Sequence, residues 1–226
     1  MVWLQVEDAL DAIIQDYVKV NHAISIFQDE KVRNTGLSGI GRKDGVGLEL
    51  GIGPGNFTPR ILDALTEELV CLDFSRDMIS AAKGNLKNER AHYIRGVFEH
   101  LPIRERSIGT TIMSFSLRDS RKKGRVIADV RGSLKSGGCF LIIDIGRPDN
   151  PLIEHFISLY IRVLVPIIGG ILTGRGYRNP WSLLYKTYDR LPRNHVLLHH
   201  IIGAFGDATL TEYSFGGLIS LKAIKG

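Results

Sequence analysis

The sequence is poor in cysteine and shows no basic leader pattern at its start. Only two cysteines, Cys71 and Cys139, occur in 226 residues. Both lie in apolar runs, where a buried free thiol is expected rather than a disulfide or a metal ligand. The first eight residues carry acids in place of a basic region, so no signal peptide is predicted. These features favour a reducing, cytoplasmic setting.

Internal repeats, low-complexity segments and long uninterrupted apolar runs are also lacking. The most apolar stretch, 152–172, contains Glu154, His155, Arg162 and Pro166, so we expect it to be a poor transmembrane helix. A content of 44% hydrophobic and 23% charged residues is ordinary for a globular protein. The net charge of +5 favours an anionic partner, either a nucleic acid or an anionic membrane surface.

Short apolar runs alternate with helical patterns through the middle of the chain. Strands are predicted near 45–50, 69–73, 92–95, 109–115 and 139–144, and helices near 56–66, 75–86 and 121–134. This alternation indicates an α/β fold with a parallel, doubly wound sheet. Two alternating runs joined by Gly216 and Gly217 predict a C-terminal hairpin that ends the sheet with a reversed strand.

We expect one domain with four parts. Helical periodicity over 7–35, followed by a Gly/Ser-rich linker over 36–45, predicts a helical cover at the N-terminus. The four parts are a helical cover at 1–44, a cofactor-binding core at 45–145, a substrate-side insertion at 146–190, and a C-terminal helix and hairpin at 191–226.

A glycine loop after the first predicted strand is the strongest functional signal. Gly51, Gly53 and Gly55 follow the apolar run at alternate positions, and Asp73 ends the next strand about twenty residues on. Such a turn lets backbone N–H groups approach a ligand, and the acid can accept both hydroxyls of a ribose. The third glycine of a dinucleotide fingerprint is replaced by Asn56. An acid two residues before the loop suits a zwitterionic amino-acid moiety better than a diphosphate.

These residues resemble the class I S-adenosylmethionine-dependent methyltransferases, and more specifically the ubiquinone/menaquinone-biosynthesis C-methyltransferase family. The pattern E-x-G-x-G-x-G followed by L-D-F-S is similar to the class as a whole. The segments 96–102, 115–119, 134–138 and 160–170 resemble the family's G-D-A-E-x-L-P, F-G-L-R-N, L-K-P-G-G and Y-x-x-x-x-x-P-x-x-G motifs. Tyr17 and Asn21 are similar to a Y-D-x-x-N segment that covers the cofactor in that family.

The resemblance implies a seven-stranded, mostly parallel, Rossmann-like sheet and a role in quinone biosynthesis. S-adenosylmethionine is the implied cofactor, S-adenosylhomocysteine its product, and no metal is expected. The implied catalytic residues are Arg118, which would stabilise or help to deprotonate an acceptor oxygen, and Asp119 beside it. The implied cofactor-binding residues are Tyr17, Glu49, Gly51, Gly53, Gly55, Asp73, Phe74, Met78, Val97, Phe98 and Ser114.

Two departures from the family pattern keep other functions open. Val97 stands where the family has an aspartate that contacts the adenine amino group, so backbone or Glu99 would have to replace that contact. Asp119 stands where the family has asparagine. Direct methyl transfer to a ring carbon of a quinol, prenylated or similarly apolar, is the leading hypothesis. The alternatives are N-methylation of a phospholipid head group or small amine, and cofactor binding without catalysis.

Several features have two interpretations. The apolar insertion would form a tunnel for a prenyl tail or a membrane-facing lid, whereas dimer contact or core packing explains it almost as well. Arg118 would equally form a salt bridge with Asp119 or another acid. His195 and His199 have metal-binding spacing on a predicted helix, but no third ligand is evident, so a solvated face is favoured. A nucleic-acid substrate is not expected, because no RNA-binding module or N-P-P-Y motif is present.

Overall fold

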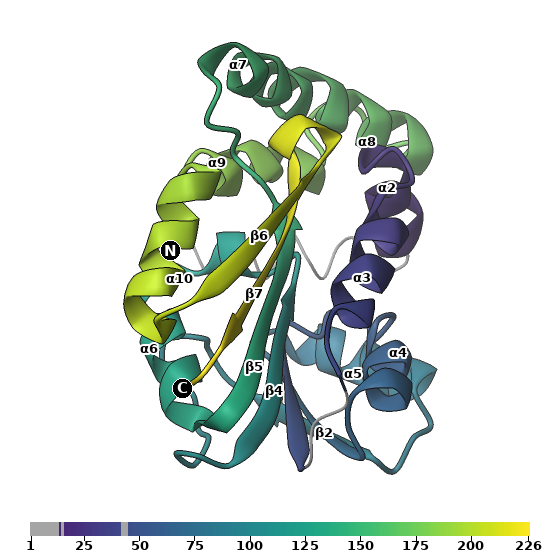
Figure 1. Cartoon of the computed structure of the whole chain (residues 1–226). Coiled ribbons are helices and arrows are strands. Elements are labelled where there is room, and N and C mark those ends of the chain that lie inside the picture. The colour runs from purple at the N-terminus through teal and green to yellow at the C-terminus, as the bar shows by residue number, and fades with distance from the viewer. Residues whose placement is uncertain (1–13, 15, 42–44) are drawn as a thin grey trace.

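The computed structural model describes residues 14, 16–41 and 45–226. Seven strands form one sheet in the order β3-β2-β1-β4-β5-β7-β6 (Figure 1). The first five are parallel, whereas β7 is antiparallel to both β5 and β6. This confirms the predicted mostly parallel sheet with a reversed strand at its end. The strands are β1 (Val46–Leu50), β2 (Glu68–Asp73), β3 (Ala91–Arg95), β4 (Ile108–Ser114), β5 (Leu134–Ile145), β6 (Ala208–Tyr213) and β7 (Leu218–Ile224).

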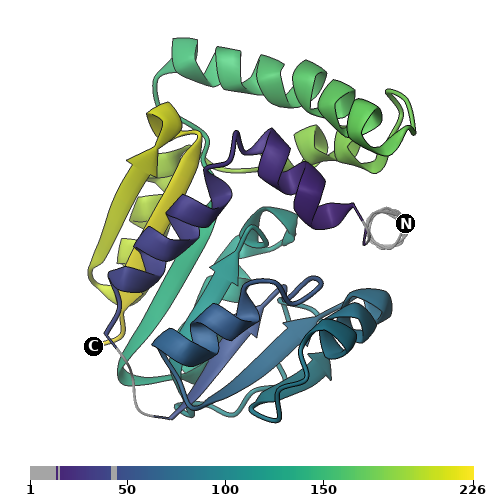
Figure 2. The ribbon, with the colours of Figure 1, turned by 90° about the vertical axis from the view of Figure 1, so that its right-hand side faces the viewer.

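Helices cover both faces of the sheet and its carboxyl edge (Figures 1 and 2). The longer ones are α2 (Tyr17–Ile24), α3 (Asp29–Ser38), α4 (Thr58–Ala64), α5 (Arg76–Asn85), α6 (Lys123–Ser133), α7 (Pro151–Leu159), α8 (Val165–Thr173), α9 (Leu184–Tyr188) and α10 (Asn194–Phe205). Short helical turns are η1 (Leu117–Asp119), η2 (Tyr160–Leu164), η3 (Pro180–Leu183) and η4 (Ser214–Gly216).

Alternation along the central strands divides the core into two layers. In β5, Phe140 and Ile142 face the cluster formed with α6 and α10, while Leu141 and Ile143 face the cluster formed with α3 and α4. Successive side chains of a strand point to opposite faces, so a sheet covered on both sides is apolar at nearly every position. Cys71 and Cys139 are buried in the second cluster and form no disulfide, as predicted.

The N-terminal segment 7–35, predicted as helical, is interrupted in the structure. Residues 7–13 lie outside the described part, and the described part divides into α2 and α3 around a turn at 25–28. Ser25 Oγ donates to Asp29 Oδ1 at 2.9 Å and to the His22 carbonyl at 2.9 Å, and such local bonds compete with the helical pattern. Ile26 and Phe27 adopt positive φ there. Helix α3 then continues through Gly36, so the predicted linker is shorter than expected.

The insertion forms a continuous helix across the carboxyl edge of the sheet (Figure 2). Asn150 caps its start, and the π-helical turn η2 joins α7 to α8. Pro166 therefore sits just after a turn with altered hydrogen bonding, where it does not end the helix. By length and composition alone, Pro151–Thr173 could cross a membrane, with a mean hydropathy of 2.0. A single helix of this kind is weak evidence for a membrane span, which agrees with the expectation of a poor transmembrane candidate.

Candidate active site

The glycine loop leaves the carboxyl end of β1 at the point where the strand order reverses. Gly51 has φ +80°, and a Cβ placed on it would lie 2.5 Å from Ser116 Cβ, so no larger residue fits. At Gly53, with φ +55°, the nearest neighbour of such a Cβ is Tyr17 Cε1 at 3.9 Å. Gly55 packs against Leu86. The loop is therefore closely packed at Gly51 and Gly55, whereas at Gly53 a methyl-sized gap separates the backbone from Tyr17.

Asp73 fixes the second side of this loop. Its Oδ2 accepts from the Gly53 N–H at 2.9 Å, and its Oδ1 accepts from the Ser75 N–H at 3.0 Å. Ser75 caps α5 as predicted, because its hydroxyl accepts from the Met78 N–H at 3.1 Å. Phe74 is half-buried at the turn, whereas the Met78 side chain is buried in the core. The carboxylate thus stands at the edge of the sheet beside the glycine loop.

Glu49 lies one residue before the end of β1 and is 2% exposed. Its carboxylate accepts from the Thr58 hydroxyl at 2.7 Å, which ties the strand to the first residue of α4. Burial raises the pKa of Glu49 to about 8, although the Thr58 bond and the Arg33 cation oppose the shift. Glu49 is therefore an acid whose charge state responds to a cation placed in the loop.

The loops after β3 and β4 complete this edge. Gly96 N–H donates to the Asp73 carbonyl at 3.0 Å, which places Val97 beside β2 with its side chain 39% exposed. Phe98 is buried against Gly51, and a Cβ placed on Gly51 would lie 3.2 Å from Phe98 Cζ. The Glu99 carboxylate accepts from the backbone N–H groups of Arg121 and Lys122, at 2.7 and 3.3 Å. It serves as a cap for the start of α6.

Arg118 occupies the centre of the site. Its backbone N–H and its Nη1 each donate to the Asp144 carboxylate at 3.1 Å, and Nη1 also donates to the Phe115 carbonyl. Asp119 Oδ1 lies 3.8 Å from Nε, beyond hydrogen-bond distance. Within the described part of the chain, the buried Nε has no hydrogen-bond partner. A buried cationic donor without a partner is a recognition point for an oxygen atom.

The charges around Arg118 shift one another's pKa values. Burial lowers the pKa of Arg118, but Asp119 and Asp144 outweigh burial and raise it, so the guanidinium stays charged. Burial raises the pKa of Asp119, against the opposing effect of Arg118. Burial likewise raises the pKa of Tyr17, whose hydroxyl senses Arg118, Asp119 and Asp73 together. Tyr17 therefore lies between the glycine loop and the Arg118 centre.

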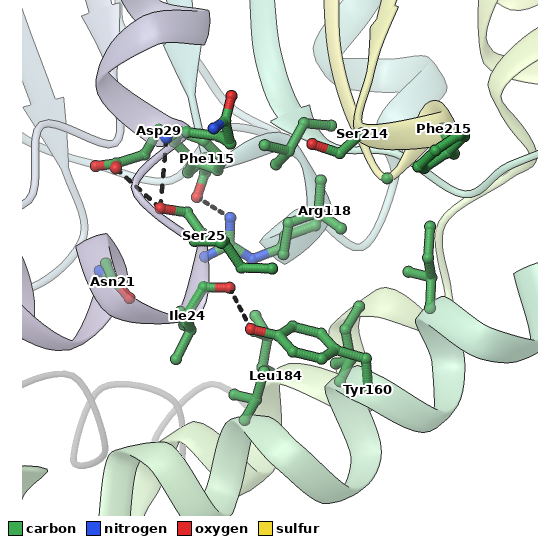
Figure 3. Close-up of a pocket in the computed structure, with 18 of the residues that line it drawn as sticks. Asn21, Ile24, Ser25, Asp29, Phe115, Arg118, Tyr160, Leu184, Ser214 and Phe215 are labelled. Atoms are coloured by element: carbon green, nitrogen blue, oxygen red, sulfur yellow. Dashed lines mark hydrogen bonds between the residues drawn. The ribbon is translucent and has the colours of Figure 1, made fainter. Parts of the chain in front are cut away.

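A cavity of about 430 Å³ opens beside Arg118 (Figure 3). Arg118 and Phe115 lie at one end of it, and Tyr160 and Leu184 enter from the insertion. The other lining residues are Tyr17, Asn21, Ile24, Ser25, Ile26, Gln28, Asp29, Arg33, Ile145, Ile157, Ile161, Val165, Ser214, Phe215, Gly217 and Leu218. Most of this lining is aliphatic or aromatic, which suits an apolar ligand with a polar group directed at Arg118.

The predicted residues fall into two groups. The glycine loop, Glu49, Asp73, Phe98 and Tyr17 meet at the carboxyl edge, and Arg118 and Asp119 meet beyond Tyr17. Ser114 lies between the groups, where its hydroxyl accepts from Arg33 Nε at 3.1 Å. Met78 lies in the core.

Sequence analysis missed two charged residues of the site. Asp144 lies one residue before the end of β5 and is 1% exposed, and its pair with Arg118 at 3.1 Å adds to the ion pair between Arg118 and Asp119, which was one of the two alternatives considered for Arg118. An acid at the end of a predicted strand is the signal that marked Asp73, so the same rule would have found it. Arg33 stacks over Phe57 and Phe115, with Cζ 5.4 and 5.1 Å from the ring centroids. No sequence pattern connects α3 to those rings.

The histidine-rich face of α10 is separate from the site. His195 Nδ1 and Asp149 Oδ2 lie 2.6 Å apart, and this bond raises the pKa of His195. His199 and His200 are exposed. Among the residues that the structure describes, no group of three or more His, Cys, Asp or Glu is placed to hold a metal ion.

Similarity to characterised proteins agrees with this geometry. A model of the ubiE/COQ5 methyltransferase family matches residues 3–222. The demethylmenaquinone methyltransferase of Lactococcus lactis is 26% identical over 194 residues, which cover 83% of this chain and 76% of that protein. The demethylmenaquinone methyltransferase of Leptospira interrogans is 30% identical over 133 residues, about half of each chain (56% and 53%).

The fold also has close counterparts among solved structures. A S-adenosylmethionine-dependent methyltransferase of Thermotoga maritima, described as a possible histamine N-methyltransferase, superposes with a TM-score of 0.69. The match covers 98% of this chain and all of that one at 13% identity, so it establishes the class I methyltransferase fold alone. Because the family model matches nearly the whole sequence, the chain belongs to the ubiE/COQ5 methyltransferase family of S-adenosylmethionine-dependent enzymes.

Proposed function

We propose that this methyltransferase acts on a ring carbon of a small apolar quinol. The observation that carries the proposal is the cavity beside Arg118, which is lined mostly by apolar side chains and has the charged Arg118 among its lining residues. A quinol fits this distribution, because its ring and tail are apolar and its hydroxyl is a strong partner for a guanidinium.

The carboxyl edge supports S-adenosylmethionine as the donor. The three glycines with positive φ leave the loop backbone without side chains, which suits a group that approaches it closely, and Asp73 beside Gly53 stands where ribose hydroxyls would be held. Glu49 is placed to respond to the cationic amino group of the methionine end. Tyr17 borders both the loop and the cavity, so it would separate donor from acceptor. When bound, the cofactor supplies an electrophilic methyl group to the cavity.

On the acceptor side, Arg118 has the main role. Its charge favours the deprotonated form of a ring hydroxyl, and the resulting oxyanion makes the adjacent ring carbon more nucleophilic. The hydroxyl proton passes to Asp119, whose carboxylate lies 3.8 Å from Arg118 Nε. The other acid beside Arg118, Asp144, is already paired with Nη1. The ring carbon would form its bond to the methyl group as the sulfur–methyl bond of the donor breaks and S-adenosylhomocysteine leaves. The proton of that ring carbon would then move to the ring oxygen, which restores the aromatic ring, and the proton held by Asp119 would pass to solvent.

The alternative of N-methylation has weaker support. An amine acceptor is cationic at neutral pH and needs a carboxylate in its pocket. Asp29 is the one acid among the described lining residues, and its carboxylate already accepts from Ser25 and pairs with His22 and Arg33. The only acid in the described lining is therefore already paired and is not free to bind an amine.

Two measurements test the proposal in sequence. Titration calorimetry should detect S-adenosylmethionine binding to the folded protein, and a folded protein that binds none would contradict any methyl-transfer function. Labelled methyl transfer should then occur into a short-tailed demethylated quinol and not into phosphatidylethanolamine. Transfer into the phospholipid alone would replace the acceptor proposed here.

A cavity-filling variant links transfer to the proposed pocket. Leu184→Trp adds bulk inside the cavity and should raise the quinol KM by about tenfold or more, since overpacking excludes the ligand. Its affinity for S-adenosylmethionine should stay unchanged. Val196→Trp, at an exposed position of α10, is the matched control and should leave both values unchanged.

A further inference from the structure

The insertion helix has two apolar faces. Ile157, Ile161 and Val165 face inward and line the cavity. The outward face carries a row of exposed apolar side chains, which we call the outer stripe. The outer stripe consists of Leu152, Phe156, Leu159, Leu164, Ile167 and Ile171. A helix that is apolar all round is normally enclosed by protein or by lipid, yet here the second face meets water.

The spacing of the outer stripe shows that it is one continuous surface. Its members follow one another by four, three, five, three and four residues. Steps of three and four keep side chains on one face of an α-helix. The single step of five, from Leu159 to Leu164, spans the π-helical turn η2, whose hydrogen bonds join residues five apart. The extra residue of that turn therefore keeps the two halves of the stripe in line.

Two turns present further apolar side chains at the entrance of the cavity. Ile26 and Phe215 both line the cavity and are nevertheless 63% and 86% exposed, so they stand at its mouth. Phe27, next to Ile26, is 65% exposed. All three have φ between +53° and +58°, a strained conformation for residues other than glycine. Strain that holds large apolar groups in water indicates a use for their exposure.

Both turns contact the insertion helix directly. Tyr160 Oη donates to the Ile24 carbonyl at 2.9 Å, just before the first turn. A Cβ on Gly217, just after the second, would lie 2.8 Å from Ile157 Cδ1. Figure 1 shows the tip of the β6–β7 hairpin beneath the insertion helix, and Figure 3 shows Phe215 on the same side of the cavity as Ser214. The mouth and the insertion helix therefore form one contiguous apolar region.

The charged residues around this region are mostly basic. Between residues 151 and 186 the sequence has four basic residues and one acid, Glu154. Glu154 pairs with Arg147 at 3.1 Å. The basic residues, all exposed, are Arg162, Arg175, Arg178 and Lys186. An apolar helix face with basic residues beside it has the composition of segments that lie in the surface of an anionic bilayer.

We propose that the outer stripe and the two mouth turns dock this protein on an anionic lipid bilayer. The helix lies in the plane of the surface, because its inner face packs on α2 and lines the cavity. The cavity mouth then faces the acyl region. The docking itself is independent of the proposed reaction. Only the consequence that an apolar acceptor enters the cavity from the membrane rests on the proposed function.

A second copy of the chain is a less suitable occupant of this surface. A two-fold symmetric contact brings the same residues of both copies together. Pairing through the outer stripe would place two sets of the same four cations in one interface with a single acid from each copy. Lipid head groups supply the opposite charge instead.

Vesicle flotation tests the docking. The protein should bind vesicles of phosphatidylcholine and phosphatidylglycerol in equal parts, and bind pure phosphatidylcholine more weakly. Phe156→Gln with Ile171→Gln should weaken binding by at least about tenfold, since two large apolar side chains no longer leave water. Val196→Gln is the control, because it changes an exposed apolar side chain on α10 away from the stripe. Calorimetry with S-adenosylmethionine verifies that each variant is folded.

A second variant tests the electrostatic part. Arg175→Glu with Arg178→Glu should abolish the preference for phosphatidylglycerol and leave binding to pure phosphatidylcholine unchanged. Absence of binding to either vesicle would overturn the proposal. So would a wild-type dimer in sedimentation analysis that Phe156→Gln with Ile171→Gln converts to a monomer without any vesicle binding. Transfer to a water-soluble quinol in detergent-free buffer needs no vesicle, so a failure of docking and a failure of the proposed reaction are distinguishable.

Discussion

The carboxyl edge around the glycine loop, where we propose that the methyl donor binds (the donor edge), and the cavity beside Arg118, where we propose that the acceptor binds (the acceptor cavity), are built from different interactions. At the donor edge, buried carboxylates bind specific groups, as when Asp73 accepts from Gly53 and Ser75, and Glu49 from Thr58. The cavity is enclosed mainly by aliphatic and aromatic side chains of α2, α7, η2 and α8. A donor with one fixed chemistry requires fixed geometry, whereas an apolar acceptor is selected by size and by exclusion of water.

Arg118 and Tyr17 connect the two regions. Arg118 is paired with Asp144 and also lines the cavity. Tyr17 borders Gly53 of the glycine loop and likewise lines the cavity. If the regions are distinct in function, a change in one should leave the ligand of the other unaffected, and only changes at these connecting residues should affect both.

The largest expected effect comes from Gly51→Ala at the donor edge. The new Cβ would lie 2.5 Å from Ser116 Cβ at φ +80°, so the loop must shift. Overpacking and left-handed strain together cost about 3 kcal/mol, which corresponds to roughly a hundredfold loss of cofactor affinity. Calorimetry with S-adenosylmethionine measures this loss. Gly84→Ala in α5, where a Cβ meets no atom within 4 Å, should retain full affinity. Equal affinities for the two variants would show that the loop does not hold the donor.

Asp144→Asn tests the connection between the regions. The neutral side chain no longer holds the Arg118 guanidinium, so its orientation toward the acceptor is less fixed. We expect kcat to fall by about ten- to thirtyfold, while affinity for S-adenosylmethionine stays unchanged. Steady-state kinetics with the quinol measures the fall. Asp129→Asn, which removes the exposed pair with Arg125, should leave kcat unchanged. A similar fall in both variants would mean that Asp144 has no special role.

The pH dependence of stability should identify the donor edge. The folded-state pKa of Glu49 is about 8, above its ordinary value of 4.5, so the folded protein keeps a proton that the unfolded chain loses. Stability contributed by this group therefore falls as pH rises from about 4.5 to about 8. Glu49→Gln stays neutral and should melt about 10 °C above the wild type near pH 8, with no difference near pH 4.5.

Thermal unfolding of both proteins across this pH range provides the measurement. Glu105→Gln, at an exposed position, is the matched control and should follow the wild-type curve. Parallel curves for wild type and Glu49→Gln would contradict the raised pKa. We expect no comparable dependence of stability on pH from the acceptor cavity, since its lining is mainly apolar.

The same contrast explains how much the sequence could predict. The alternation of strands and helices, the C-terminal hairpin, the Ser75 cap and the glycine loop follow from local patterns, because periodicity and turn chemistry are short-range properties. The turn at Ile26 and Phe27 was missed because a side-chain bond between Ser25 and Asp29 overrides helical periodicity. The cavity assembles from four segments distant in sequence, so no single motif describes it.

Within the site, predictability followed the kind of interaction. The position of Asp73 beside the glycine loop was predictable, because an acid at the carboxyl end of a parallel strand lies at the same edge as that loop. Arg33 was not, because its stacking on Phe57 and Phe115 depends on how α3 packs over the sheet. A salt bridge with Asp119 or another surface acid was considered for Arg118. The pair with Asp144 is buried instead, and the pairing of β4 with β5 brings the two residues within reach. Contacts created by packing are therefore the part that the sequence leaves open.

The smallest expected effect comes from Tyr160→Phe in the cavity. The hydroxyl of Tyr160 donates to the Ile24 carbonyl and ties the insertion helix to α2. Losing one neutral hydrogen bond costs about 1 kcal/mol, so the quinol KM should rise about two- to fivefold while affinity for S-adenosylmethionine stays constant. Tyr177→Phe is the control, because its hydroxyl donates to the Arg162 carbonyl within the insertion itself. If both variants raise KM equally, the bond between α2 and the insertion does not shape the cavity. A loss of cofactor affinity in Tyr160→Phe would show that the two regions are coupled through α2, against the division drawn here.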